Sequence, residues 1–250
     1  MVGFHPVREA LRARRRPLRR LAVRAALRHP GLGELRALAR AAGVAVEELS
    51  ADALARLAPG ARTQGLVLEA GPLPAVPLEA LLALGPRGGR RLLAFDGVED
   101  PQNVGALLRA ADAAGATGAL LTERHAPPLG AAVSRASAGA LEHLPVARVV
   151  NLARALGQAK GAGFWVVALD LEAEESLFAA PDALFQGDLV LVVGAEDRGI
   201  RHGIRRVADH RLRIPTRGHV ASLNVASAGT LALFEAARRA QPRGGGAAGG

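Results

Sequence analysis

The sequence has no cysteine. A disulfide framework, a cysteine-ligated zinc site and a cysteine nucleophile are therefore excluded. The seven histidines show no metal-binding spacing, so we expect no metal ion. Neither GxGxxG nor a Walker A pattern occurs, and a dinucleotide or ATP site has no support. No apolar run is long enough to span a membrane, so we expect no membrane partner. The first six residues are followed by arginines and not by the apolar region of a signal peptide. We therefore expect a cytoplasmic protein.

Lysine is nearly absent, because Lys160 is the only one, and arginine carries almost all of the positive charge. The formal net charge is +9, which favours a polyanionic partner, with nucleic acid ahead of a membrane surface. Residues 1–72 hold 13 arginines and 6 acidic residues, a net charge of +7, whereas the rest of the chain carries only +2. The excess is local, so we expect RNA contacts in the N-terminal part rather than only a solvated surface. The candidate RNA-binding residues are Arg12, Arg14, Arg15, Arg16, Arg19 and Arg20.

Prolines and glycines divide the chain. The stretch "AGPLPAVPLEALLALGPRGGRR" is typical of a linker around one short helix at 78–84. We therefore expect a small domain at 1–72, a linker at 73–89 and a larger domain at 90–240. The end of the chain, "QPRGGGAAGG", has nothing to bury, so a disordered tail is expected at 241–250.

From residue 91 onward, short apolar runs alternate with helical patterns. The runs "LLAF", "ALLT", "ARVV", "WVVAL" and "LVLVV" suit strands buried on both faces. Helices are expected at 104–114, 152–162 and 222–239. This alternation predicts an α/β fold with an open, mostly parallel sheet. Ligands of such sheets bind beyond the carboxyl ends of the strands, so the segments that follow the strands are candidate site loops.

Three of these segments are rich in glycine, proline and polar residues: "DGVEDPQNVG", "GAEDRGI" and "PTRGHVASLNVASAG". In the helix after the first segment, Val104, Leu107, Leu108 and Ala111 form one apolar stripe. Arg109 points away from that stripe. An exposed helix arginine is usually a solvated surface residue, and the segment before it is what makes this one a candidate for function.

The three segments, in this order and spacing, resemble the three motifs of the SpoU branch of the SPOUT methyltransferases, the knotted RNA ribose 2′-O-methyltransferases. The match covers 91–239 and includes "DGVEDPQNVGALLRAADAAGA", "LVLVVGAEDRGI" and "IPTRGHVASLNVASAGTLALFEA". "GFHPVREAL" and "TQGLVLEA" resemble the ends of the small RNA-binding domain, similar to ribosomal protein L30e, that precedes the catalytic domain in this family. "SAGALEHLPVARVVNLARAL" resembles the bacterial members that methylate a guanosine ribose in the peptidyl-transferase loop of 23S rRNA.

The resemblance implies a trefoil-knotted domain, S-adenosyl-L-methionine as cofactor, and a homodimer whose interface helps to build the active site. The implied catalytic residues are Asn103, Arg109, Glu196, Ser222 and Asn224. The expected cofactor-binding residues are Thr122, Gly194, Gly199, Ile214 and Leu223. Asn103 could equally be the N-cap of its helix, Glu196 a solvated loop carboxylate, and Ser222 and Asn224 caps of the last helix.

Methyl transfer to a ribose needs the weakly acidic 2′-hydroxyl to lose its proton and to be held in line with the methyl group. The family suggests an arginine as the base at the position of Arg109, yet guanidinium stays protonated in proteins. We therefore expect Arg109 to clamp a phosphate bidentately and to stabilise charge on the 2′-oxygen. The identity of the base stays open. The alternatives are the same chemistry on tRNA and an rRNA-binding assembly factor without catalysis.

Overall fold

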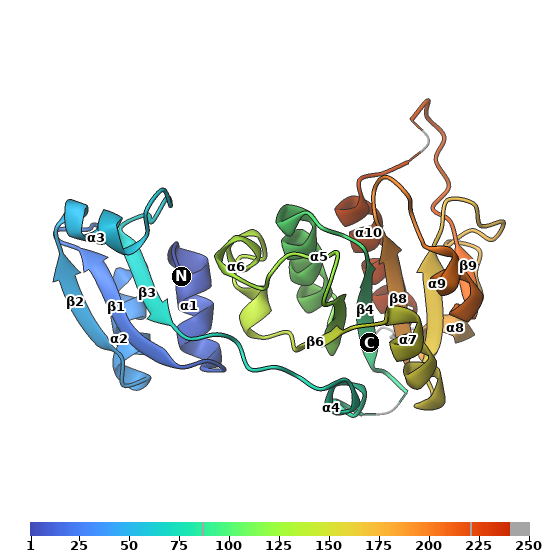
Figure 1. The fold of residues 1–250 in the computed structure, drawn as a ribbon, viewed down its shortest axis with the longest axis horizontal. Helices are drawn as coiled ribbons and strands as arrows, with labels where there is room; N and C mark the ends of the chain where they lie inside the picture. The colour runs from blue at the N-terminus through green and yellow to red at the C-terminus, as the bar shows by residue number, and fades with distance from the viewer. Residues whose placement is uncertain (87, 221, 241–250) are drawn as a thin grey trace, which may run out of the picture.

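The computed structural model describes residues 1–86, 88–220 and 222–240. It contains a three-stranded sheet in the N-terminal part and a six-stranded sheet in the C-terminal part (Figure 1). The predicted tail at 241–250 lies outside the described residues. Among those residues, no helix is both long and apolar enough to cross a bilayer.

The N-terminal sheet has the strand order β2-β1-β3. Its strands are β1 (Leu18–Arg24), β2 (Ala45–Leu49) and β3 (Leu66–Ala70), with β2 parallel and β3 antiparallel to β1. The helices are α1 (Phe4–Ala13), α2 (Leu32–Ala41) and α3 (Ala51–Leu57). Val7 and Leu11 of α1 are fully buried with Leu35 of α2 against Leu21 of β1, which forms the main core of this part. Leu54 of α3 packs on the other face of the sheet.

A short helix, α4 (Leu78–Leu82), follows the extended segment after β3. The helix predicted from the sequence was 78–84, so α4 ends two residues earlier than predicted. Leu81 is fully buried in the core of the larger part, where it packs with Leu92 and Leu120. The segment interpreted as a linker is therefore anchored on the second sheet through this helix.

The larger sheet has the strand order β6-β5-β4-β8-β7-β9, and every neighbouring pair is parallel. The strands are β4 (Arg91–Asp96), β5 (Gly118–Thr122), β6 (Val146–Val149), β7 (Trp165–Leu169), β8 (Leu189–Gly194) and β9 (His210–Leu212). The predicted mostly parallel α/β sheet is thus confirmed.

Helices cover both faces of this sheet (Figure 1). One face carries α5 (Pro101–Ala113), α6 (Ala131–Ala136), α8 (Ala183–Gln186) and α10 (Val225–Ala240), with the 3-10 turn η1 (Ala140–Glu142). The other face carries α4, α7 (Leu152–Gly161) and α9 (His202–Val207). The connection after β4 runs through α5 and that after β8 through α9, so the two central strands send the chain to opposite faces. Such a switch point is where open α/β sheets bind ligands.

The two parts meet where α1 lies against α6 and η1 (Figure 1). Arg16 donates to both carboxylate oxygens of Glu142, with Nε–Oε2 at 2.9 Å and Nη2–Oε1 at 2.8 Å. His143 Nε2 lies 2.9 Å from Glu9 Oε2 in the same contact. Glu142 is fully buried, and this burial raises the pKa of its carboxyl group.

Candidate active site

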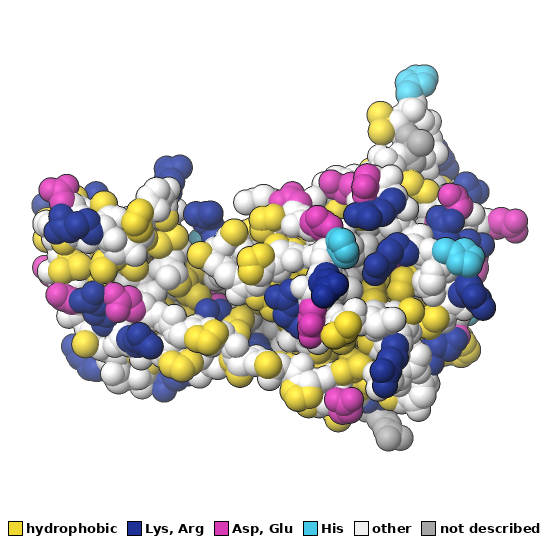
Figure 2. Space-filling model, viewed as in Figure 1, with side chains coloured by type: hydrophobic (Ala, Val, Ile, Leu, Met, Phe, Trp, Pro, Cys, Tyr) yellow, Lys and Arg dark blue, Asp and Glu magenta, His cyan; other side chains and the backbone are white. Residues whose placement is uncertain are grey.

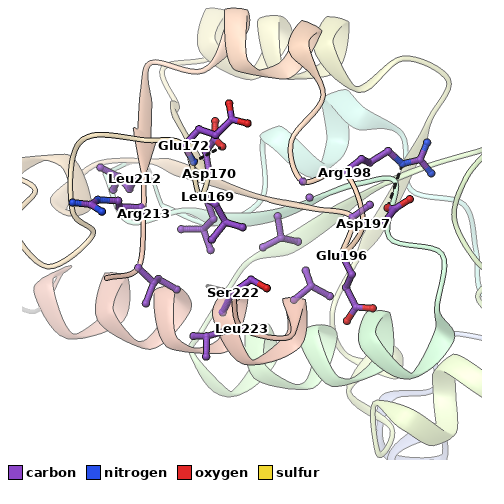
Figure 3. Close-up of a pocket in the computed structure, with 18 of the residues that line it drawn as sticks. Leu169, Asp170, Glu172, Glu196, Asp197, Arg198, Leu212, Arg213, Ser222 and Leu223 are labelled. Atoms are coloured by element: carbon purple, nitrogen blue, oxygen red, sulfur yellow. Dashed lines mark hydrogen bonds and ion pairs between the residues drawn. The ribbon is translucent and has the colours of Figure 1, made fainter. Parts of the chain in front are cut away.

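A cavity of about 280 Å³ opens beyond the carboxyl ends of β7, β8 and β9 (Figure 3). Its size is near the lower end of the range for small-molecule sites. Apolar side chains on the strand ends and on the segment before α10 line it, including Leu169, Val193, Leu212, Ile214 and Leu223. Gly194, Gly199 and Ser222 line it as well. Of the five expected cofactor-binding residues, four therefore lie together.

The loop after β8 closes tightly on itself. Gly199 N donates to Ala195 O at 2.8 Å, and Gly199 has a φ of 60°, in the left-handed region that favours glycine. A Cβ atom at Gly194 would lie 2.3 Å from the carbonyl carbon of Gly199. Only glycine fits at position 194, and the close approach of the backbone there shapes one wall of the cavity.

Asp96, at the end of β4, holds this loop in place. Its side chain is fully buried and accepts from the backbone N of Arg201 at 2.8 Å and from Arg201 Nε at 2.5 Å. The sequence analysis missed this pair. An aspartate that directly follows the buried run "LLAF" was the one available signal, and it did not identify a partner 105 residues away.

Asn103, Glu196 and Asn224 form one hydrogen-bonded network. Asn103 Nδ2 and Asn224 Nδ2 both donate to Glu196 Oε1, at 3.0 and 2.6 Å, and Asn224 Nδ2 also lies 3.1 Å from Asn103 Oδ1. Figure 3 shows Glu196 directed toward the helices α5 and α10. Three residues that lie far apart in the sequence thus meet beside the cavity, at the switch point between β4 and β8.

Helix caps explain why the two asparagines are oriented in this way. The N-cap of α5 is Asp100, which accepts from Gln102 N at 2.9 Å, so the interpretation of Asn103 as the N-cap is wrong. Its position in the first turn leaves its side chain free to reach Glu196. Asn224 does cap a helix, because its Oδ1 accepts from Ala226 N at 2.9 Å. That bond turns its Nδ2 toward Glu196. The last helix begins at Val225, not at 222 as predicted, and Ser222 lies before it.

Arg109 does not reach this network within one chain. It is exposed on α5, as predicted, and it makes no hydrogen bond or ion pair with any residue that the structure describes. Six residues of helix separate it from Asn103, about 9 Å along the axis and about 120° around it. Ala106, one turn earlier on the same side, lies with Leu231 and Phe234 of α10 in a shallow apolar groove.

Thr122 lies apart from the other expected cofactor-binding residues. It ends β5 and lines a second cavity, with Asn151, Leu152, Arg201 and Ile204, instead of the cavity at β7–β9. The described residues contain no group of three or more His, Asp or Glu side chains that could hold a metal ion.

The six candidate RNA-binding arginines are not equivalent in the structure. Arg12 pairs with Glu9 and Glu34, and Arg20 with Glu47 and Glu69. Those bonds raise the pKa of Arg20. Arg15 and Arg16 both contact Glu142 across the contact between the two parts, and burial lowers the pKa of Arg15. Arg14 donates to Leu11 O, and Arg19 is exposed. Among the described residues, Arg14, Arg15 and Arg19 have no carboxylate partner within hydrogen-bond or ion-pair distance, and Arg15 is held by the main-chain carbonyl of Glu142.

The part of the chain that holds the parallel sheet and the Asn–Glu–Asn network is a methyltransferase domain. Residues 90–234 match the model of the SpoU rRNA methylase family, and residues 1–76 match a model described as RNA 2′-O ribose methyltransferase substrate binding. The chain belongs to the SpoU rRNA methylase family.

Several proteins resemble this chain over nearly its whole length. A protein from Ralstonia nicotianae named 23S rRNA (guanosine-2′-O-)-methyltransferase RlmB is 38% identical over 240 residues, which is 96% of this chain and 95% of the relative. The AdoMet-bound rRNA methyltransferase from Sinorhizobium meliloti aligns with a TM-score of 0.77 at 28% identity, covering 95% of this chain and 86% of that one. The SpoU methyltransferase AviRb from Streptomyces viridochromogenes, in complex with AdoMet, aligns with a TM-score of 0.78 at 26% identity, covering 96% and 89%.

Proposed function

We propose that this protein transfers a methyl group from S-adenosyl-L-methionine to the ribose 2′-hydroxyl of a guanosine in 23S rRNA, in the cytoplasm. The observation that carries the proposal is the Asn103–Glu196–Asn224 network beside a small-molecule cavity at the switch point of the sheet. The names of relatives at 36–39% identity over most of the chain support the substrate.

The cavity at β7–β9 fits the cofactor in chemical terms. Leu212, Ile214 and Leu223 offer apolar contact for a flat base, and the loop closed by Gly194 and Gly199 brings backbone N–H and C=O groups within reach of a nucleoside. When bound there, S-adenosylmethionine supplies the activated methyl group. We assign its binding to Gly194, Gly199, Ile214 and Leu223, without Thr122.

Glu196 and the two asparagines form the part of the site that receives the ribose. Both amide groups donate to Glu196 Oε1, which leaves Oε2 available to accept a bond from a substrate hydroxyl. A hydroxyl held at Oε2 would lie at the edge of the cofactor cavity, because Glu196 and Ser222 both line that cavity. These residues therefore orient the 2′-hydroxyl and favour loss of its proton as it attacks.

Arg109 completes the site from a second copy of the chain in this proposal. The groove beside it includes Leu231 and Phe234, which are 38% and 48% exposed on α10. Pairing of this α5–α10 face with another copy buries these side chains. It also places Arg109 of each copy beside the partner's site. There its guanidinium clamps a phosphate of the target nucleotide. The trefoil knot belongs to the same proposal, and the match to the SpoU rRNA methylase family supports it.

The small N-terminal part supplies RNA affinity. Its unpaired arginines, Arg14 and Arg19 among them, add positive charge near the catalytic part, whereas Arg15 and Arg16 fix the two parts together. This division refines the expectation that all six arginines of the cluster contact RNA.

Ribose-methylation mapping of the host RNAs tests the proposal. In a strain that lacks this protein, one guanosine of 23S rRNA should lose its 2′-O-methyl group, and the purified protein with S-adenosylmethionine should restore it. Loss of a methyl group from a tRNA instead would identify tRNA as the substrate. If the set of ribose methyl groups is unchanged and the protein does not bind the cofactor, the protein is an RNA-binding factor without catalytic activity.

A further inference from the structure

The second cavity lies on the α7–α9 face of the sheet, beyond the ends of β5 and β6, and measures about 350 Å³. It is lined by Thr122, Arg124 and His125 after β5, by residues 150–153 at the start of α7, and by Arg201, Gly203 and Ile204 at the start of α9. We propose that this cavity binds a backbone phosphate of the RNA strand that carries the target nucleotide. The inference rests on the proposed function.

Thr122 provides the first observation. The residue is only 5% exposed, and its Oγ1 is buried with no hydrogen-bond partner among the described residues. Side chains alternate along a strand, so Thr122 faces the same side as Leu120, which packs in the core under α7 and α9. A buried hydroxyl without a partner is costly. A phosphate oxygen in the cavity would accept a hydrogen bond from it.

The start of α7 provides the second observation. This helix has ten residues, and Asn151 Oδ1 accepts from Arg154 N at 3.0 Å. The N–H groups of Leu152 and Ala153, which line the cavity, have no acceptor within the helix. A helix N-terminus with such free donors favours an anion.

The charges around the cavity are mostly positive. Arg124 is exposed and has no ion pair with any described residue, whereas Arg201 is held by the buried carboxylate of Asp96. Arg148 donates to Thr122 O and Glu123 O and so fixes the end of β5. Besides Asp96, the carboxylate of Glu99 contacts a lining residue, because its Oε1 lies 3.1 Å from His125 Nδ1. In Figure 2 the Lys and Arg side chains gather on this face, over α7 and α9.

Glu99 also connects this cavity with the site already described. It lines the small pocket that contains Asn103 and Glu196, and it contacts His125 on the other side. An RNA strand whose ribose reaches Glu196 therefore continues along the same edge of the sheet into the second cavity. The phosphate bound there belongs to a neighbouring nucleotide and fixes the direction of the strand.

The test uses the full chain and a transcript of the peptidyl-transferase loop of 23S rRNA. Thr122→Val removes the hydroxyl at nearly constant shape, and Arg124→Gln removes one charge. Arg206→Gln is the matched control, because Arg206 is exposed on α9 and lines neither cavity. We expect each of the first two variants to bind the transcript several-fold more weakly, with unchanged cofactor affinity. Arg124→Gln should leave the melting temperature unchanged, and Thr122→Val should not lower it, because it removes a buried hydroxyl without a partner. Arg124→Gln should also lower the slope of log affinity against log salt by about 0.7–0.9. The control should bind nearly as wild type does.

Phosphate ethylation interference locates the contact. One phosphate near the target nucleotide should block binding of the wild type when ethylated, and the same modification should have little effect on Thr122→Val or Arg124→Gln. Wild-type affinity of Thr122→Val, a drop in its cofactor affinity, or equal weakening by Arg206→Gln would overturn the inference. Methyl transfer by the wild type on the same transcript is measured separately. Its absence would refute the proposed function, while the binding comparison still decides what the cavity does.

Discussion

Arg16 and Glu142 form a doubly hydrogen-bonded ion pair between residues 126 positions apart, and this pair joins the N-terminal part to the catalytic part. The carboxylate is fully buried and the Arg16 side chain is 9% exposed. Arg15 Nη1 donates to the carbonyl of the same glutamate. Two arginines from the basic cluster thus fix the N-terminal part, and with it the rest of the cluster, against the catalytic part.

Removing one partner of this pair should be costly. Arg16→Gln leaves the Glu142 carboxylate buried without its counter-charge, and breaking such a pair costs about 3–5 kcal/mol. Urea denaturation should show that loss, and hydrogen exchange should rise in α1 and η1. Arg20→Gln removes an arginine from two exposed ion pairs on the N-terminal sheet and should change stability little. Equal effects of the two substitutions would mean that the Arg16–Glu142 pair does not hold the two parts together.

Gly194→Ala should damage the cofactor cavity. The new Cβ would lie 2.3 Å from the Gly199 carbonyl carbon, so the loop must shift, at a cost of about 1–3 kcal/mol. Isothermal titration should show at least tenfold weaker S-adenosylmethionine binding, and the melting temperature should fall. Gly157→Ala on α7 meets no atom within 4 Å and should be neutral or stabilising by up to about 1 kcal/mol. If Gly194→Ala binds the cofactor with normal affinity, this loop is not part of the cofactor site.

Stability in acid should depend on Glu235. Its hydrogen bonds from Arg238 and Arg239 lower the pKa of its carboxyl group to about 2. A carboxyl whose pKa is lower in the folded state contributes stability above its unfolded pKa of about 4.5, and this contribution is lost as the pH falls toward 2. Glu235→Gln should therefore melt below the wild type at pH 7, and the difference should shrink between pH 4.5 and 3. A difference that is constant with pH would show that the charge of Glu235 is not responsible.

Arg109 and Glu196 should complement each other between copies of the chain. We expect Arg109→Ala and Glu196→Gln each to reduce methyl transfer by on the order of 100-fold or more, with the fold intact. A mixed dimer has one site with both native residues if Arg109 acts on the partner's site, so mixing the two variants should restore a substantial part of the activity. Arg109→Lys should also be inactive, because ammonium lacks the bidentate geometry. No recovery on mixing would place Arg109 in its own chain's site or outside the chemistry.

Periodicity and composition were sufficient for the fold class. The buried runs that became β4, β5, β7 and β8 are continuous and apolar, and the fully buried stripe of α5 follows the helical repeat. The start of α10 was placed three residues too early, because Ser222 is also a good capping residue and the sequence alone does not choose between it and Asn224.

The sequence named candidate site residues but did not indicate how they are arranged. The resemblance to the family's motifs named Asn103, Glu196 and Asn224 as candidates, but their shared bond to one carboxylate oxygen depends on long-range packing. The separation of Thr122 from the cofactor cavity has the same origin, since the strand order places β5 two positions away from β8. Nor does local sequence distinguish Arg16, which meets a buried glutamate, from Arg19, which is exposed.

Single-turnover methyl transfer to the 23S rRNA transcript by Glu196→Gln, beside Asp197→Asn as control, tests the central claim most directly. Asp197 is the exposed neighbouring carboxylate and takes no part in the Asn103–Glu196–Asn224 network. The account predicts that the wild type and Asp197→Asn form a 2′-O-methylguanosine at similar rates. It predicts that Glu196→Gln binds S-adenosylmethionine nearly as well but transfers its methyl group at least 100-fold more slowly. Wild-type transfer rates in Glu196→Gln, or a wild type that binds the cofactor and methylates no ribose, would contradict it.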